Sequence, residues 1–195
     1  REIPFILAGN YDFEGVNSVS FDAVKGAYEA VSYLIKLGHR DIGFISGSFK
    51  YQCNLELLKG YKLALREFGI GYNEDFVQCD KHEDVTNLIE KLLTLPTAPS
   101  AIFAVNDMLA IGAMERLREK GIRIPEDVSI VGCDDIETAS YVTPSLTTIR
   151  IFPEEQGKMA VRRLLKESSG NDNLMRTTVI PSELVIRESC SEFSG

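Results

Sequence analysis

The sequence contains none of the short motifs that would indicate a common class of enzyme. No GxGxxG follows an apolar run, and the patterns GxxxxGKS, GxxxxGKT, HExxH and GxSxG are absent from the chain. The single glycines in ISGS and VGCD form no glycine-rich loop that could cradle a pyrophosphate. We therefore expect a binding protein that is not an enzyme and has no cofactor.

Long apolar runs are also missing. No run approaches the ~20 residues that a membrane helix needs, so we expect no membrane partner. Nothing at the start resembles a signal peptide. Because the chain begins at Arg1 and not at a methionine, we expect a fragment or a processed product.

Positive charge and clustered cysteines are lacking as well. The formal net charge is −8, which argues against this segment itself gripping a phosphate backbone. Any role on nucleic acid must therefore lie outside these residues. The four cysteines are scattered, with no CxxC and no nearby histidine pair. This spacing favours reduced thiols in a cytoplasmic protein over a disulfide framework or a metal site.

The order of the expected elements is the most informative feature of the 195 residues. Short apolar runs alternate with longer segments of helical periodicity, which predicts βαβ units and an α/β fold built on an open parallel sheet with helices on both faces. The expected strands are Ile3–Leu7, Asp41–Ser46, Phe76–Cys79, Ala101–Val105 and Val128–Val131. The expected helices are Asp22–Gly38, Asn54–Phe68, Val85–Leu93 and Asp107–Lys120.

The pattern changes after Pro144. We expect a strand at Thr147–Ile151, a helix from Pro153 to near Gly170, and final strands at Thr177–Ile180 and Leu184–Ile186. A polar linker, Glu167–Asn173, separates this helix from the last strands. These elements follow a domain that already looks complete.

A ligand site is expected at the carboxyl ends of the parallel strands. The polar residues of the loops there would suit a small polar molecule; they are Tyr51, Lys81, His82, Asn106, Asp107, Asp134 and Asp135. Structural roles compete with ligand contact. Asp107 stands where a helix N-cap is expected, Asn106 fits a turn as well as a ligand contact, and paired aspartates after a strand often form turns. His39, after a helix-ending glycine, is expected to cap or to make hydrogen bonds.

Several stretches resemble the LacI/GalR family of transcription regulators, whose core is similar to a type I periplasmic sugar-binding protein. They are YLIKLGHRDIGFISG, LLKGYKLALREFGI, AIFAVNDMLAIGAMERLREKGIRIPEDVSIVGCDDIE, TPSLTTIR and IPSELVIRESC. The resemblance implies a set of effector-binding positions, namely Tyr51, Cys53, Leu57, Lys81, Asn106 and Asp134. Family members usually have arginine where this chain has Leu57 and often an aromatic residue at Lys81. These departures favour an unusual metabolite, such as an acidic one, or a protein co-regulator over a standard sugar.

The resemblance also implies two lobes joined by three crossings, near Asn17–Asp22, Thr147–Phe152 and Asn173–Ile180. Residues 1–20 would be a remnant of the first lobe and residues 21–146 the second, effector-binding lobe. Residues 147–172 would return to the first lobe and supply a helix, and residues 173–195 would supply the last crossing and the final strand of the second lobe. With most of the first lobe outside the chain, Val161 and Leu164 should be exposed.

A homodimer is implied by the same resemblance. The segment Asp107–Lys120 is apolar around more than half of its circumference, which fits either a core helix or a subunit interface. The interface residues would be Met108, Ile111, Met114 and Tyr141. The function implied is effector sensing and dimerisation in a DNA-binding regulator, most simply a repressor, with operator DNA held by a headpiece outside this chain. The alternatives are a periplasmic or receptor-linked binding protein and a flavodoxin-like enzyme or response regulator.

Overall fold

The computed structural model describes residues 5–11, 15–168 and 177–193. Its larger part is a six-stranded sheet of β3 (Ile42–Ser46), β4 (Val77–Cys79), β5 (Ala101–Ala104), β6 (Ser129–Asp134), β7 (Thr147–Arg150) and β9 (Glu183–Val185). The strand order is β4-β3-β5-β6-β7-β9, and every pairing is parallel except the antiparallel pairing of β7 with β9. The predicted α/β fold class is confirmed.

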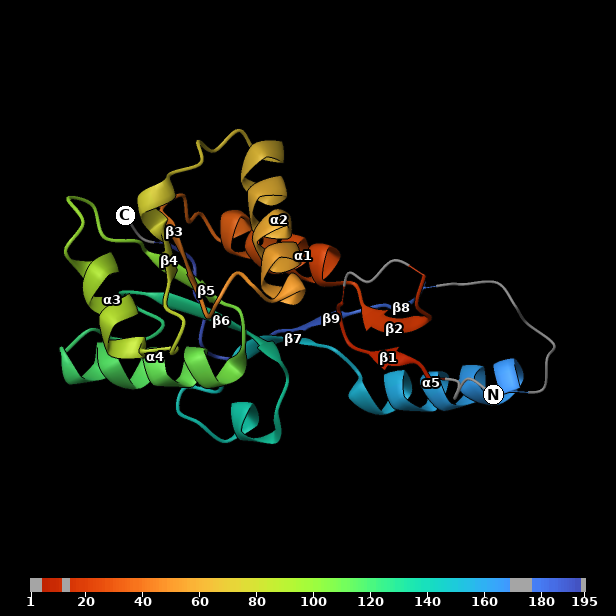
Figure 1. Ribbon diagram of the computed structural model, residues 1–195. Coiled ribbons are helices and arrows are strands. Elements are labelled where there is room, and N and C mark those ends of the chain that lie inside the picture. The colour runs from red at the N-terminus through yellow and green to blue at the C-terminus, as the bar shows by residue number, and fades with distance from the viewer. Residues whose placement is uncertain (1–4, 12–14, 169–176, 194–195) are drawn as a thin grey trace.

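Helices cover both faces of this sheet (Figure 1). On one face α1 (Ala23–Lys36) packs closely against α2 (Gln52–Glu67), and on the other α3 (Val85–Leu93) packs against α4 (Asp107–Glu119). The α1–α2 contact requires Gly60, because a Cβ there would collide with the backbone carbonyl of Val24. Asp22 caps α1 as expected, accepting a hydrogen bond from the Lys25 amide at 3.0 Å.

A second, smaller sheet lies to one side of the large one (Figure 1). It consists of β1 (Leu7–Ala8), β2 (Ser18–Phe21) and β8 (Thr177–Ile180), all parallel, in the order β1-β2-β8. The helix α5 (Pro153–Ser168) contacts β1 and β2. Parts of the predictions for Ile3–Leu7, for the linker Glu167–Asn173, for the crossing Asn173–Ile180 and for the helix end at Gly170 lie outside the described residues.

Each of the three expected crossings contains a strand. The segment Asn17–Asp22 contains β2, which pairs with β8 from the last crossing. From the sequence we expected Thr147–Ile151 to belong to the part that returns to the first lobe. In the structure this segment contributes β7 to the large sheet. On α5 the side chain of Val161 is 58% exposed and that of Leu164 is half-buried, so the expected exposure holds fully for Val161 only.

The core of the large sheet is continuous and aromatic near its centre. Phe44 on β3 contacts the rings of Phe49, Tyr61 and Phe103, with centroids 5.3–6.4 Å apart. The buried Tyr61 hydroxyl donates a hydrogen bond to the Ile42 carbonyl at 2.8 Å, so its polar atom is satisfied inside the core.

Two short 3-10 helices, η1 (Glu74–Phe76) and η2 (Glu137–Ser140), complete the large lobe, which is the six-stranded sheet with the helices α1 to α4. His39 is buried and makes the hydrogen bonds expected of it. Its Nδ1 lies 2.9 Å from the Ser100 hydroxyl, and its Nε2 lies 3.0 Å from the Ser129 hydroxyl. Burial lowers the pKa of His39, which favours the neutral ring.

Candidate functional site

The chain reverses its direction across the large sheet between β3 and β5. From β3 it passes through α2 to the edge strand β4, then through α3 back to β5 on the other side of β3. The carboxyl ends of β3 and β5 therefore flank the topological switch point, where open α/β sheets bind their ligands. Tyr51, just before α2, and Asn106, just after β5, lie in the two connections that leave this point.

Asp134 stands at the carboxyl end of the next strand, β6, with an unusual backbone. Its φ is 122°, in a region that favours glycine, and such residues cluster at functional sites. The carboxylate is half-buried, and within the described part of the chain it has no hydrogen bond or ion pair. Burial, followed by the charge of Asp107, raises the pKa of Asp134 to about 7. An unpartnered, partly desolvated carboxylate is ready to accept hydrogen bonds from a ligand.

The thiol of Cys53 belongs to the same neighbourhood. Burial, followed by the negative charges of Glu56 and Asp134, raises the pKa of Cys53 to about 12. The thiol therefore stays protonated and serves as a small, weakly polar group beside Asp134. All four cysteines are free, as the sequence led us to expect.

The structure corrects the role of Asp107. The N-cap of α4 is Asn106, whose side-chain oxygen accepts from the Leu109 amide at 2.7 Å. Asp107 is the first residue of the helix and is fully buried; its carboxylate accepts from the Thr148 hydroxyl and from the Ile136 amide, the latter at 2.9 Å. Its pKa is raised to about 6, chiefly by burial. Asp107 thus ties α4 to β7 and to the segment after β6.

Asp135 and Asp134 differ in role although they are adjacent. The Asp135 carboxylate is 2.6 Å from Arg150 Nε and 2.6 Å from Arg187 Nη2. These charge-assisted bonds lower its pKa in spite of burial. Asp135 therefore holds β6 to β7 and to the chain after β9, which is a structural role, while Asp134 remains available.

The other expected effector positions are placed differently. Tyr51 is 66% exposed, and Lys81 and His82 are exposed in the turn after β4. Leu57 is fully buried in the core of the large lobe, because its position on α2 faces the sheet. In this structure Leu57 therefore packs in the core and presents no surface to a ligand.

The sequence did not predict one contact, which joins the small sheet to the helix α2. Asn10, just after β1, pairs with the backbone of Phe21 through both ends of its amide, and its Nδ2 also donates to Glu56 on α2 at 2.5 Å. Gln52 donates to the other oxygen of Glu56 at 3.1 Å. A loop of the small sheet is thereby held against the helix that carries Tyr51 and Cys53. No local pattern signals a pair 46 residues apart.

The expected dimer residues lie in two environments. Met108 on α4 is 67% exposed and Tyr141 after η2 is 75% exposed, while Ile111 is half-buried and Met114 is buried. The last two also line a groove of about 810 Å³ between α4 and the segments 121–126 and 142–144. The surplus apolar surface of α4 is thus shared between core and exterior.

Within residues 5–11, 15–168 and 177–193, no three or more His, Cys, Asp or Glu side chains are grouped so that they could hold a metal ion. In the same ranges no helix has the length and apolar character needed to cross a membrane.

Comparison with known proteins decides the family. A model of the periplasmic binding protein-like domain matches residues 31–190. The chain belongs to this family. It is 40% identical to the ribose operon repressor of Haemophilus influenzae over 171 residues, which cover 86% of this chain and 51% of that protein. The chain thus spans about half the length of the curated relatives it matches.

Solved structures place it more narrowly. A LacI-family regulator from Enterococcus faecium with bound ribose superposes with a TM-score of 0.86 and 29% identity, covering 98% of this chain and 72% of the other. The Escherichia coli transcriptional repressor ascG superposes with a TM-score of 0.84 and is 33% identical in sequence. This match covers 96% of this chain and 69% of the other. The predicted resemblance to the LacI/GalR effector-binding core is confirmed, and the relatives favour a transcription regulator over a periplasmic binding protein.

Proposed function

We propose that this chain is the effector-sensing and dimerisation region of a LacI/GalR-type DNA-binding repressor controlled by a small molecule. Its relatives are repressors, and an operator-binding headpiece would lie outside the half that this chain covers. The net charge of −8 fits a region that does not itself hold DNA. The four free thiols fit a cytoplasmic location.

The lobe boundaries follow the two sheets in this proposal. The small sheet with α5 is the part of the first lobe present in the chain, and the large sheet is the second lobe. The effector lies between them, at the carboxyl ends of β3, β5 and β6. The Asn10–Glu56 contact joins the two lobes beside this site, so a ligand that prefers one lobe arrangement would shift the population of that arrangement.

The unpartnered carboxylate of Asp134 is the observation that carries the site. A neutral molecule rich in hydroxyl groups would donate hydrogen bonds to it. An anion would be repelled, because Glu56, Asp107 and Asp134 all raise the pKa of a neighbour through their negative charges. We therefore favour a neutral, sugar-like effector over an acidic metabolite or a protein co-regulator. Ribose bound to a structural relative is an example of this class.

Calorimetric titration of the full-length protein with ribose and a panel of neutral pentoses and hexoses tests the site. We expect one saturable ligand and a loss of affinity of at least about tenfold in Asp134→Ala, because a charge-assisted hydrogen bond is worth about 1.5–3 kcal/mol. Glu137→Gln, a nearby exposed carboxylate on η2, is the control and should bind as the wild type. Equal affinity of Asp134→Ala and wild type would show that the site is elsewhere.

The second half of the proposal is a homodimer built on α4 and the segment near Tyr141. The exposed Met108 and Tyr141 and the groove beside Met114 supply apolar surface for a two-fold contact. The groove also carries charges of both signs, Glu115 and Arg118, which a symmetric partner could pair. Tyr141→Asp should convert the full-length protein to a monomer in sedimentation, and an unchanged mass would reject this surface.

A further inference from the structure

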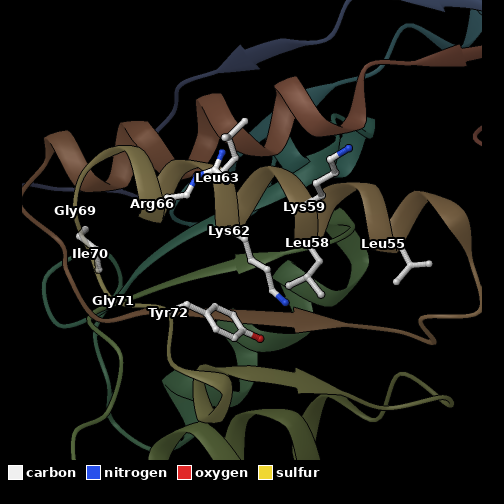
Figure 2. A pocket seen from close by; sticks show the side chains of 10 residues that line it. All are labelled: Leu55, Leu58, Lys59, Lys62, Leu63, Arg66, Gly69, Ile70, Gly71 and Tyr72. Atoms are coloured by element: carbon white, nitrogen blue, oxygen red, sulfur yellow. The ribbon is translucent and has the colours of Figure 1, made fainter.

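A second groove of about 810 Å³ lies between α2 and the segment 69–72 that follows it (Figure 2). Its apolar surface comes from Leu55, Leu58 and Leu63 on the helix and from Ile70 and Tyr72 in the segment that follows. Figure 2 shows Leu55 and Leu58 on the side of α2 that faces the Tyr72 ring. Leu55 and Tyr72 are each 44% exposed, although the opposite face of the same helix already supplies Leu57, Tyr61 and Leu65 to the core. Leu55 and Tyr72 therefore add exposed apolar surface to the groove beyond the residues that pack into the core.

The charges around this groove are of one sign. Lys59, Lys62 and Arg66 line it, and no acidic side chain does. All three cations are exposed, and none has an ion pair in the described part of the chain. Among the residues that the structure describes, the one interaction of these three charged groups is that of the Lys62 ammonium, 4.3 Å from the centre of the Tyr72 ring. By contrast, Arg116, Lys120, Arg123, Arg150 and Arg187 are paired with carboxylates in this chain of net charge −8.

The acidic residues of α2 do not neutralise this face. Glu56 is bonded to Asn10 and Gln52 on the side toward the small sheet, and Glu67 accepts a hydrogen bond from the Tyr28 hydroxyl on the side toward α1. The helix thus separates its carboxylates from its cations, and the separation leaves a positive rim around an apolar floor.

We propose that this groove docks an acidic amphipathic helix of a partner protein. The stretch from Leu55 to Arg66 is three turns long, roughly 17 Å, which matches a short helix laid alongside. Apolar side chains of the partner would enter between Leu55, Leu58 and Tyr72, and its carboxylates would pair with the lysines and the arginine. The surface is distinct from the effector site and from the surface proposed for dimerisation.

The apolar floor argues against a nucleic acid as the occupant. A nucleic acid would gain from the cations but would place its phosphates against an apolar floor. A second copy of this acidic chain could supply carboxylates, so self-association must be measured in the same experiment.

The test uses the full-length protein and a fluorescein-labelled synthetic helix of about 14 residues with leucines on one face and glutamates beside them. We expect saturable anisotropy that weakens on raising the salt from about 50 mM to about 300 mM. Lys59→Glu/Lys62→Glu should weaken binding about tenfold, because two attractions become repulsions. Lys36→Glu/Lys91→Glu, the same change in charge at exposed positions outside the groove, should bind as the wild type.

Three results would overturn the proposal. A peptide with lysines in place of the glutamates could bind equally well, or the Lys59/Lys62 variant could keep full affinity. The mass of the unliganded full-length protein could fall in that variant, which would identify a second copy as the occupant. Effector titration and thermal melting of both double variants establish that they are folded, and Leu55→Ser, at an exposed leucine, should weaken binding without changing either.

Discussion

The raised pKa of Asp134 links the effector site to the stability of the protein. A carboxyl whose pKa is about 7 in the folded state and 3.8 as a free group holds a proton between these values that the unfolded chain has released. The free energy of unfolding of the wild type therefore falls as the pH rises from about 4 to about 7. Asp134→Asn keeps the size of the side chain and titrates no proton, so it escapes this loss.

The size of the effect follows from the shift. About three pKa units at 1.36 kcal/mol each give an upper limit of about 4 kcal/mol. Because Asp134 is only half-buried and can be reached by solvent, we expect roughly 1–2 kcal/mol of stabilisation in the asparagine variant at pH 8. For a chain of this length that raises the melting temperature by roughly 2–8 °C. The same variant should bind effector more weakly, because asparagine lacks the charge that strengthens hydrogen bonds from hydroxyl groups.

Urea unfolding followed by circular dichroism at several values between about pH 5 and about pH 8 measures this difference. The advantage of Asp134→Asn over the wild type should be small at pH 5 and grow through pH 7. Glu137→Gln, in an exposed position, should show no such growth. A difference between Asp134→Asn and wild type that is constant with pH would refute the argument, since a packing or hydrogen-bond effect does not follow proton release.

Two further predictions concern the support of the site. Gly132→Ala should destabilise the protein by about 1–3 kcal/mol in urea unfolding, because the added methyl group collides with the buried Asp107 carboxylate. The control is Gly157→Ala, at a position inside α5 where an added Cβ has nothing within 4 Å; it should stabilise the protein by about 0.5–1 kcal/mol. A similar effect of both substitutions would contradict the predicted collision. His39 has a lowered pKa, so the unfolded chain binds its proton more readily and the wild type should lose stability as the pH falls below about 6.5. His39→Gln should remove this contribution, and an unchanged acid-side slope in urea midpoints would contradict it.

Local patterns were sufficient for the fold. The alternation of strands and helices predicted the α-helices and strands of the large sheet and its flanking layers from Asp22 onward to within a few residues, since each has a strong apolar period and a recognisable end. The short 3-10 helices η1 and η2 were not predicted. The sequence could not show that Asn17–Asp22 would pair as β2 with β8, because those partners are 159 residues apart. It also did not reveal that β9 runs antiparallel to β7, which depends on where the chain returns from the small sheet.

The site was predicted as a location more than as a set of contacts. Strand ends are fixed by the fold, so Tyr51, Asn106 and Asp134 fell at the expected edge. The role of each side chain depends on which residues distant in the sequence come to lie beside it, and local patterns do not reveal these neighbours. Asn106 and Asp107 are equally good capping residues. In the structure the Asp107 carboxylate accepts a hydrogen bond from the Thr148 hydroxyl on β7, and Asn106 caps α4.

The same reasoning explains why two adjacent aspartates have opposite roles. Asp134 ends β6 and Asp135 follows it, both with a positive φ, but their carboxylates have different neighbours. The Asp135 carboxylate meets Arg150, the last residue of the neighbouring strand β7, and Arg187, which follows β9, so its charge is neutralised. The other meets burial and further negative charge, which makes its ionised form unfavourable until a ligand supplies donors. A hydroxyl-rich effector would thus gain part of its affinity by relieving a penalty that the fold itself imposes on Asp134.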